Sequence, residues 1–172
     1  MSHISQIDYE TASDAIRRAH DEELRLRGRM TNMKRTLLHS PVAHRIYAEW
    51  FTLRDALHPV VDDRALWIFC LAISTASRSR IPIGFFRRAL IGAGVDPDTL
   101  VLSEEEAVLQ QFGEAIVRDS NDIPASLWVA LKARYTEEAL VNLVAFAGIM
   151  VATAMFGNVV DVEFDVELKP FV

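Results

Sequence analysis

The longest uncharged segment of this chain runs from residue 139 to residue 160, 22 positions without a charged side chain. That length meets the ~20 apolar residues that a membrane-spanning helix requires. However, Asn142, Thr153 and Asn158 interrupt the segment, acidic residues flank both ends, and no Lys or Arg is placed to set an orientation. We therefore expect a central helix buried on most faces, in a chain that does not associate with membranes.

The same segment predicts self-association. Small residues recur along it and allow close approach of neighbouring helices: Ala145, Ala147, Gly148, Ala152, Ala154 and Gly157. A chain of 172 residues rarely covers such a helix on every side, so the remaining apolar surface is expected to be buried between subunits. A homo-oligomer is the favoured interpretation, and a monomer with an unusually apolar central helix is the alternative.

Helix signals recur along the rest of the chain. Ser40 precedes Pro41, Ser103 and Glu106 form a capping box, and Thr136 precedes two glutamates. These signals predict an all-α fold of about seven helices, including long ones over residues 11–27, 41–57 and 64–76. Residues 160–167 alternate between apolar and acidic side chains, which is typical of an edge strand or an extended tail.

Length, charge and cysteine content exclude several classes of protein. The 172 residues fit one domain, and a net charge of −6 disfavours nucleic acid as a partner. Cys70 is the only cysteine, so one chain can form neither an internal disulfide nor a multi-cysteine zinc site. The polar N-terminus does not resemble a secretory signal, so we expect a cytoplasmic protein.

Local motifs for chemistry are sparse. The five histidines lack metal-ligand spacing and are expected to be solvent-facing or capping residues, and no glycine-rich loop precedes a helix. No metal or cofactor is therefore expected. Cys70 lies in an apolar segment, where burial favours an inert thiol. Arg78, Arg80, Arg87 and Arg88 could receive a small anion or form a solvated face.

A family resemblance emerges from the order of several short segments. These are residues 27–33 (RGRMTNM), 38–41 (LHSP), 64–66 (RAL), 85–90 (FFRRAL), 94–97 (GVDP), 103–112, 118–119 and 135–141 (YTEEALV). Together they resemble the carboxymuconolactone decarboxylase and alkylhydroperoxidase D-like superfamily. The resemblance covers about residues 20–166 and leaves 160–172 as an extended tail. It implies a helical bundle that assembles into trimers or hexamers.

The residues that carry chemistry in that superfamily differ here. The resemblance places the two cysteines of the hydroperoxidase branch at Ser79 and Pro82 and its histidine at Phe86. The upstream glutamate falls on Ala65 or Trp67. A serine and a proline cannot pass through the sulfenate and disulfide of peroxide reduction. Pro82 and Phe86 also supply neither the carboxylate nor the histidine that is typical of the decarboxylase branch.

Three functional hypotheses follow from these observations. The first is a family member without the thiol redox site, acting as a non-redox ligand-binding or structural oligomer, with a small molecule near Arg80, Phe85 and Arg88. The second is a peroxidase-related, hydroperoxide-reducing enzyme or a lyase-type enzyme that uses non-standard residues such as Cys70, Ser79 or Arg80. The third is a membrane-associated helical protein.

Overall fold

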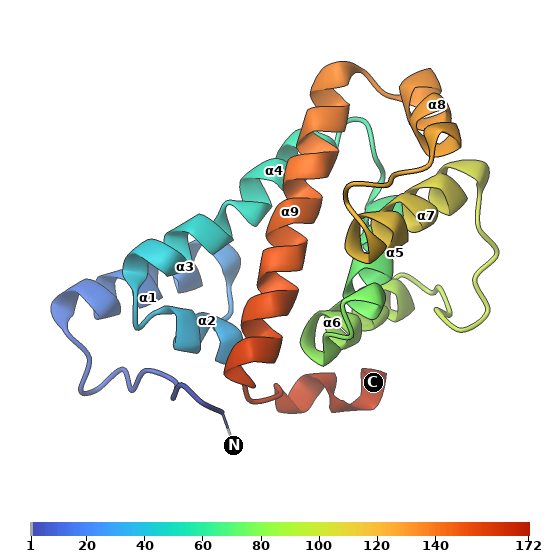
Figure 1. Ribbon diagram of the computed structural model, residues 1–172. Coiled ribbons are helices and arrows are strands. Elements are labelled where there is room, and N and C mark those ends of the chain that lie inside the picture. Colours follow the sequence, from blue (N-terminus) through green and yellow to red (C-terminus); the bar gives the residue numbers. More distant parts are fainter. Residues whose placement is uncertain (1) are drawn as a thin grey trace.

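The structure is a computed structural model that describes residues 2–172, and within this range it is helical without any strand (Figure 1). The α-helices are α1 (Asp14–Arg27), α2 (Asn32–Leu37), α3 (Pro41–Ala48), α4 (Trp50–Leu57), α5 (Asp63–Ala76), α6 (Arg80–Gly92), α7 (Glu104–Arg118), α8 (Ala125–Arg134) and α9 (Glu137–Val160), followed by the 3-10 helix η1 (Val166–Phe171). The expected all-α fold is confirmed. The described helices outnumber the seven or so expected, partly because the run over 41–57 divides at Glu49 into α3 and α4.

Side-chain caps fix most helix starts where the sequence signals them. The hydroxyl of Ser40 accepts from the backbone N–H of Ala43, and Asp62 accepts from that of Ala65. The capping box of Ser103 and Glu106 has both of its hydrogen bonds. Each such cap stabilises its helix by about 1 kcal/mol, because it satisfies an amide that has no partner within the helix.

The main core forms where α5, α7 and α9 meet, and aromatic rings stack through it. Phe69 of α5 lies between Phe112 of α7 and Phe146 of α9, with ring centroids 6.0 Å and 6.5 Å away. All three side chains are at most 1% exposed. Gly113 brings α7 close to α5, because a Cβ there would lie 3.1 Å from the carbonyl oxygen of Phe69. This core holds α5 and α7 as the rigid centre of the molecule.

Helix α9 runs the length of the molecule and contacts helices on both sides of it (Figure 1). It is long and apolar enough to cross a membrane by length and composition alone, a property that core helices of other proteins share. Its inner face is buried, but a stripe of apolar side chains stays exposed along the opposite face: Val141, Val144, Met155 and Val159. These positions recur at helical spacing and define what we call the α9 stripe.

A second, smaller core joins the two ends of the chain. Met33 and Leu37 of α2 pack there with Val160 and Val162, close to the end of α9. The segment after α9 forms no edge strand, and it is an extended tail only in part, because residues 166–171 coil into η1 against α6. Gly84 permits this contact, since a Cβ there would lie 3.3 Å from Leu168.

Candidate functional site

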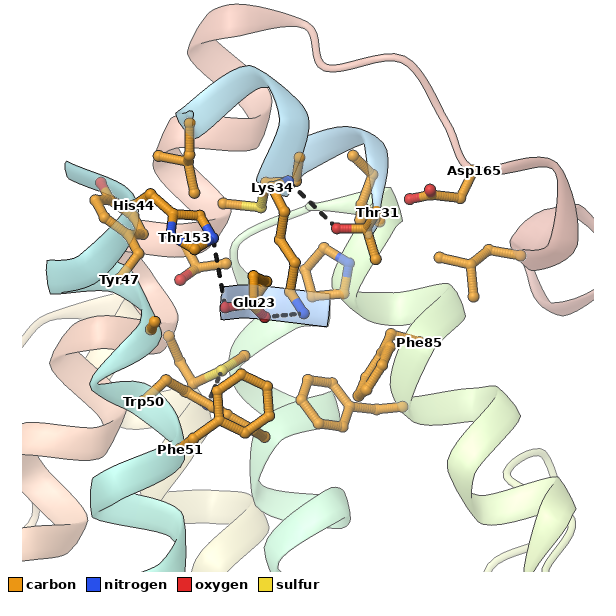
Figure 2. Close-up of a pocket in the computed structure, with 18 residues that line it drawn as sticks. Glu23, Thr31, Lys34, His44, Tyr47, Trp50, Phe51, Phe85, Thr153 and Asp165 are labelled. Carbon is orange, nitrogen blue, oxygen red and sulfur yellow. Dashed lines mark hydrogen bonds and ion pairs between the residues drawn. The ribbon is translucent and has the colours of Figure 1, made fainter. Parts of the chain in front are cut away.

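A pocket of about 170 Å³ opens between the N-terminal helices and α6 (Figure 2). Helices α1 to α4, α6 and α9 and the C-terminal segment all contribute to its lining. The lining residues are Glu23, Thr31, Met33, Lys34, Leu37, His44, Tyr47, Ala48, Trp50, Phe51, Ile81, Pro82, Phe85, Phe86, Met150, Thr153, Asp165 and Leu168. The surface of the pocket is almost entirely apolar.

Aromatic rings form one wall of this pocket. Trp50 and Phe51 meet edge to face with centroids 4.8 Å apart, and Phe85 and Phe86 do the same at 5.1 Å. Trp50 also packs against the ring of Phe86, and its indole N–H lies 2.9 Å from the sulfur of Met150. The wall is therefore rigid and offers flat apolar faces to a ligand.

Opposite the rings lies a polar group of three side chains from three helices, which we call the Glu23 cluster (Figure 2). Oε1 of Glu23 is 2.5 Å from Nζ of Lys34, and Oε2 of Glu23 is 3.5 Å from Nε2 of His44. The side chains of Glu23 and His44 are 4% and 8% exposed. A carboxylate this deeply buried requires a partner charge, and Lys34 provides it.

His44 corrects the expectation that every histidine is solvent-facing or capping. Burial lowers the pKa of its imidazole, the nearby Glu23 carboxylate opposes that shift, and the Lys34 ammonium adds to it. The net direction is downward from the ordinary value of 6.5, so the neutral form of His44 predominates at pH 7.

A second carboxyl group, Asp165, lines the pocket on the other side of Lys34 from His44 (Figure 2). Its Oδ1 accepts from the backbone N–H of Asn32 at 2.9 Å, which ties the C-terminal segment to α2. Burial raises the pKa of Asp165, and the Asn32 hydrogen bond opposes that shift. This contact helps to place Leu168 over the pocket.

Some of the predicted site residues line the pocket and others lie outside it. Pro82 and Phe86 line the pocket, as does Phe85. Pro82 is tolerated in the first turn of α6, where backbone amides have no partner within the helix. Ser79 is 1% exposed, and its hydroxyl lies 3.5 Å from the carbonyl oxygen of Ala154 rather than in the pocket lining.

Cys70 is separate from the pocket. It is 0% exposed within the main core, and burial raises the pKa of its thiol well above the ordinary value. A neutral, enclosed thiol is a poor nucleophile. Ala65, one of the positions that the resemblance gives to the upstream glutamate, is also buried in this core.

The arginines near the start of α6 do not gather around the pocket. Arg87 forms a bidentate pair with Asp98, with N–O distances of 2.8 Å and 2.7 Å. The guanidinium of Arg80 lies over the ring of Phe164, and that of Arg88 lies over the ring of Phe85. Arg80 and Arg88 are absent from the lining, so their role in ligand binding stays a prediction.

Sequence reasoning missed the Glu23 cluster, although one signal for it was present. Ile16, His20, Glu23 and Arg27 follow one another at helical spacing along the inward side of α1, and Glu23 is the buried residue of that helix. A carboxylate on the inward face of an amphipathic helix requires a partner. Its partners Lys34 and His44 come from other helices, so only the fold identifies them.

Comparison with solved structures identifies the architecture. The crystal structure titled as an alkylhydroperoxidase AhpD core, an uncharacterized peroxidase-related protein from Ralstonia eutropha JMP134, matches with a TM-score of 0.71 and 18% sequence identity. The match covers 97% of this chain and 94% of that one. No family model matches the sequence, and no curated protein matches it as a relative. The chain therefore has the fold of the alkylhydroperoxidase AhpD core, as its sequence resemblance indicated.

Proposed function

We propose that this chain is a member of the carboxymuconolactone decarboxylase and alkylhydroperoxidase D-like superfamily that lacks the thiol redox site and binds a small molecule without redox chemistry. The pocket carries this proposal. It includes Pro82 and Phe86, the positions that the resemblance assigns to the redox site, and its lining contains no thiol. Aromatic walls and a few convergent polar groups are typical of small-molecule sites.

The experiment for this proposal is a thermal unfolding screen with small uncharged ring compounds. A ligand that binds only the folded protein raises its Tm. Ala48 lines the pocket, so Ala48→Trp should fill the space and abolish the increase. Ala133→Trp, at an exposed position of α8, is the matched control and should keep it. The proposal is wrong if no compound raises the Tm or if Ala48→Trp leaves the increase unchanged.

A lyase-type activity is a second candidate, and the Glu23 cluster favours it. Glu23 can accept a proton, and neutral His44 beside it can donate or accept one. Lys34 would stabilise negative charge that develops on a substrate oxygen. A lyase would consume its substrate steadily, whereas a binding protein would not. In a lyase, Glu23→Gln should stop this consumption and still bind the substrate.

A hydroperoxide-reducing activity that works by thiol chemistry would have to use Cys70, because it is the single cysteine of the sequence. Its complete burial and raised thiol pKa argue against this. We expect no consumption of an organic hydroperoxide with a dithiol reductant above the reductant-only rate. Turnover that disappears in Cys70→Ser would establish a one-cysteine peroxidase instead.

We also propose that the protein is a homo-oligomer, a trimer or hexamer by family resemblance. The α9 stripe supports this, because contiguous exposed apolar surface of this kind commonly marks a subunit interface. The pocket lies on the side of α9 that faces α4 and α6, so the proposed interface and the pocket are separate surfaces.

A further inference from the structure

Glu23 has unused capacity to accept hydrogen bonds. Among the described residues, Nζ of Lys34 at 2.5 Å is the one partner of its Oε1, and Nε2 of His44 at 3.5 Å is the one partner of its Oε2. An ionised carboxylate has about four acceptor sites. A buried carboxylate that lines an apolar pocket with acceptor sites unfilled is suited to a ligand that brings a hydrogen-bond donor.

The size of the pocket limits the rest of the ligand. Its volume of about 170 Å³ is close to the ~150 Å³ of an engineered apolar cavity that holds benzene. The rings of Trp50, Phe51, Phe85 and Phe86 form one wall of this space and favour a flat apolar body. One aromatic ring with one small substituent therefore fills it.

The charges of the Glu23 cluster favour an uncharged ligand. Glu23 and Lys34 carry opposite charges in direct contact, and His44 is predominantly neutral. A charged ligand would add an unbalanced charge beside a pair that is already matched, in surroundings that solvate it poorly. Asp165, whose Oδ2 has no hydrogen-bond partner within residues 2–172, disfavours an anion further.

We propose that the pocket takes a neutral, single-ring aromatic compound with a hydroxyl group, and that Glu23 accepts the hydrogen bond from this hydroxyl. This inference rests on the proposed function and specifies its ligand class. The ring would pack against the aromatic wall, and the O–H would point toward the Glu23 cluster. Binding of this kind forms and breaks no covalent bond.

The test compares phenol with toluene, which has a methyl group in place of the hydroxyl, by isothermal titration calorimetry at pH 7. Phenol should bind about tenfold more tightly or better, as expected for a hydrogen bond to a charged acceptor. Benzoate and benzylamine serve as the anionic and cationic probes, and both should bind more weakly than phenol.

The double variant Glu23→Met/Lys34→Met removes the acceptor without leaving an unpaired charge. It should bind phenol and toluene equally, with its folding checked by helical circular dichroism. Arg87→Met/Asp98→Met, which removes an ion pair outside the pocket lining, is the matched control and should keep the preference for phenol.

Other results separate this inference from the proposed function. Equal binding of phenol and toluene by the unmodified protein would overturn the role of Glu23 and leave the ligand-binding function standing. Tighter binding of benzoate or benzylamine would overturn the neutral ligand class. A phenol preference that survives in the double variant would assign the hydroxyl to another acceptor. If none of the four compounds binds and the unfolding screen also finds no ligand, both proposals fail.

Discussion

At the scale of single residues, the Glu23–Lys34 pair determines how the pocket tolerates substitution. Lys34→Met leaves the Glu23 carboxylate buried without its partner charge, and removal of one member of a buried pair destabilises a protein by about 3–5 kcal/mol. We expect a loss of this order in the free energy of unfolding, measured with urea. The double variant Glu23→Met/Lys34→Met should recover most of it. Equal stability of Lys34→Met and the unmodified protein would show that solvent reaches Glu23.

His44 gives the stability a defined pH dependence. Its pKa in the folded state is below the ordinary value of 6.5, so the unfolded chain binds the proton more readily. The free energy of unfolding should therefore fall as the pH drops below about 6.5 toward the folded-state pKa. In His44→Gln this part of the decline should disappear. Urea unfolding at several pH values between 8 and 5 gives the free energy of unfolding of the unmodified protein and of His44→Gln. If this free energy falls equally with pH in both proteins, His44 is not the group responsible.

At the scale of helices, two mid-helix glycines should respond oppositely to the same change. Gly113→Ala places a Cβ 3.1 Å from the Phe69 carbonyl, and such overpacking costs about 1–3 kcal/mol. At Gly148 a Cβ meets nothing within 4 Å in the single chain, so Gly148→Ala should gain up to about 1 kcal/mol of helix propensity when it is introduced into Val144→Lys/Val159→Lys, in which the α9 stripe has no partner. Thermal unfolding of both variants checks this. A stabilising Gly113→Ala would mean that α5 and α7 separate easily.

The helices themselves were largely predictable, because their signals are local. Ser40, Ser103 and Thr136 cap the helices that the sequence assigned to them. The division of α3 from α4 at Glu49 was not predictable, since no proline or glycine marks it. The contacts of the C-terminal segment with α6 depend on packing between distant parts of the chain, as does the Glu23 cluster. The sequence thus indicated where helices form, and the fold was needed to show which faces meet.

At the scale of the whole molecule, the α9 stripe predicts the state of assembly. Val144 and Val159 are 46% and 70% exposed, so lysines there should leave the fold of one chain intact and disrupt a subunit interface. We expect Val144→Lys/Val159→Lys to lower the molar mass found by light scattering to that of one chain. Val129→Lys, at an exposed site of α8, should not change it. A single-chain mass for the unmodified protein would remove the basis for the proposed oligomer.

The position of the pocket between the main core and the smaller second core has a consequence for how the molecule opens. Helices α2 and α3 pack around the second core, and α1 contributes to neither core, so these three helices should exchange backbone hydrogen for deuterium sooner than α5 and α7. A bound molecule would touch Glu23 and Lys34 on one side and Phe86 on the other. It should therefore slow exchange in the N-terminal helices and leave α5 and α7 unaffected. The rate of hydrogen exchange in the N-terminal helices would then report whether the pocket is occupied.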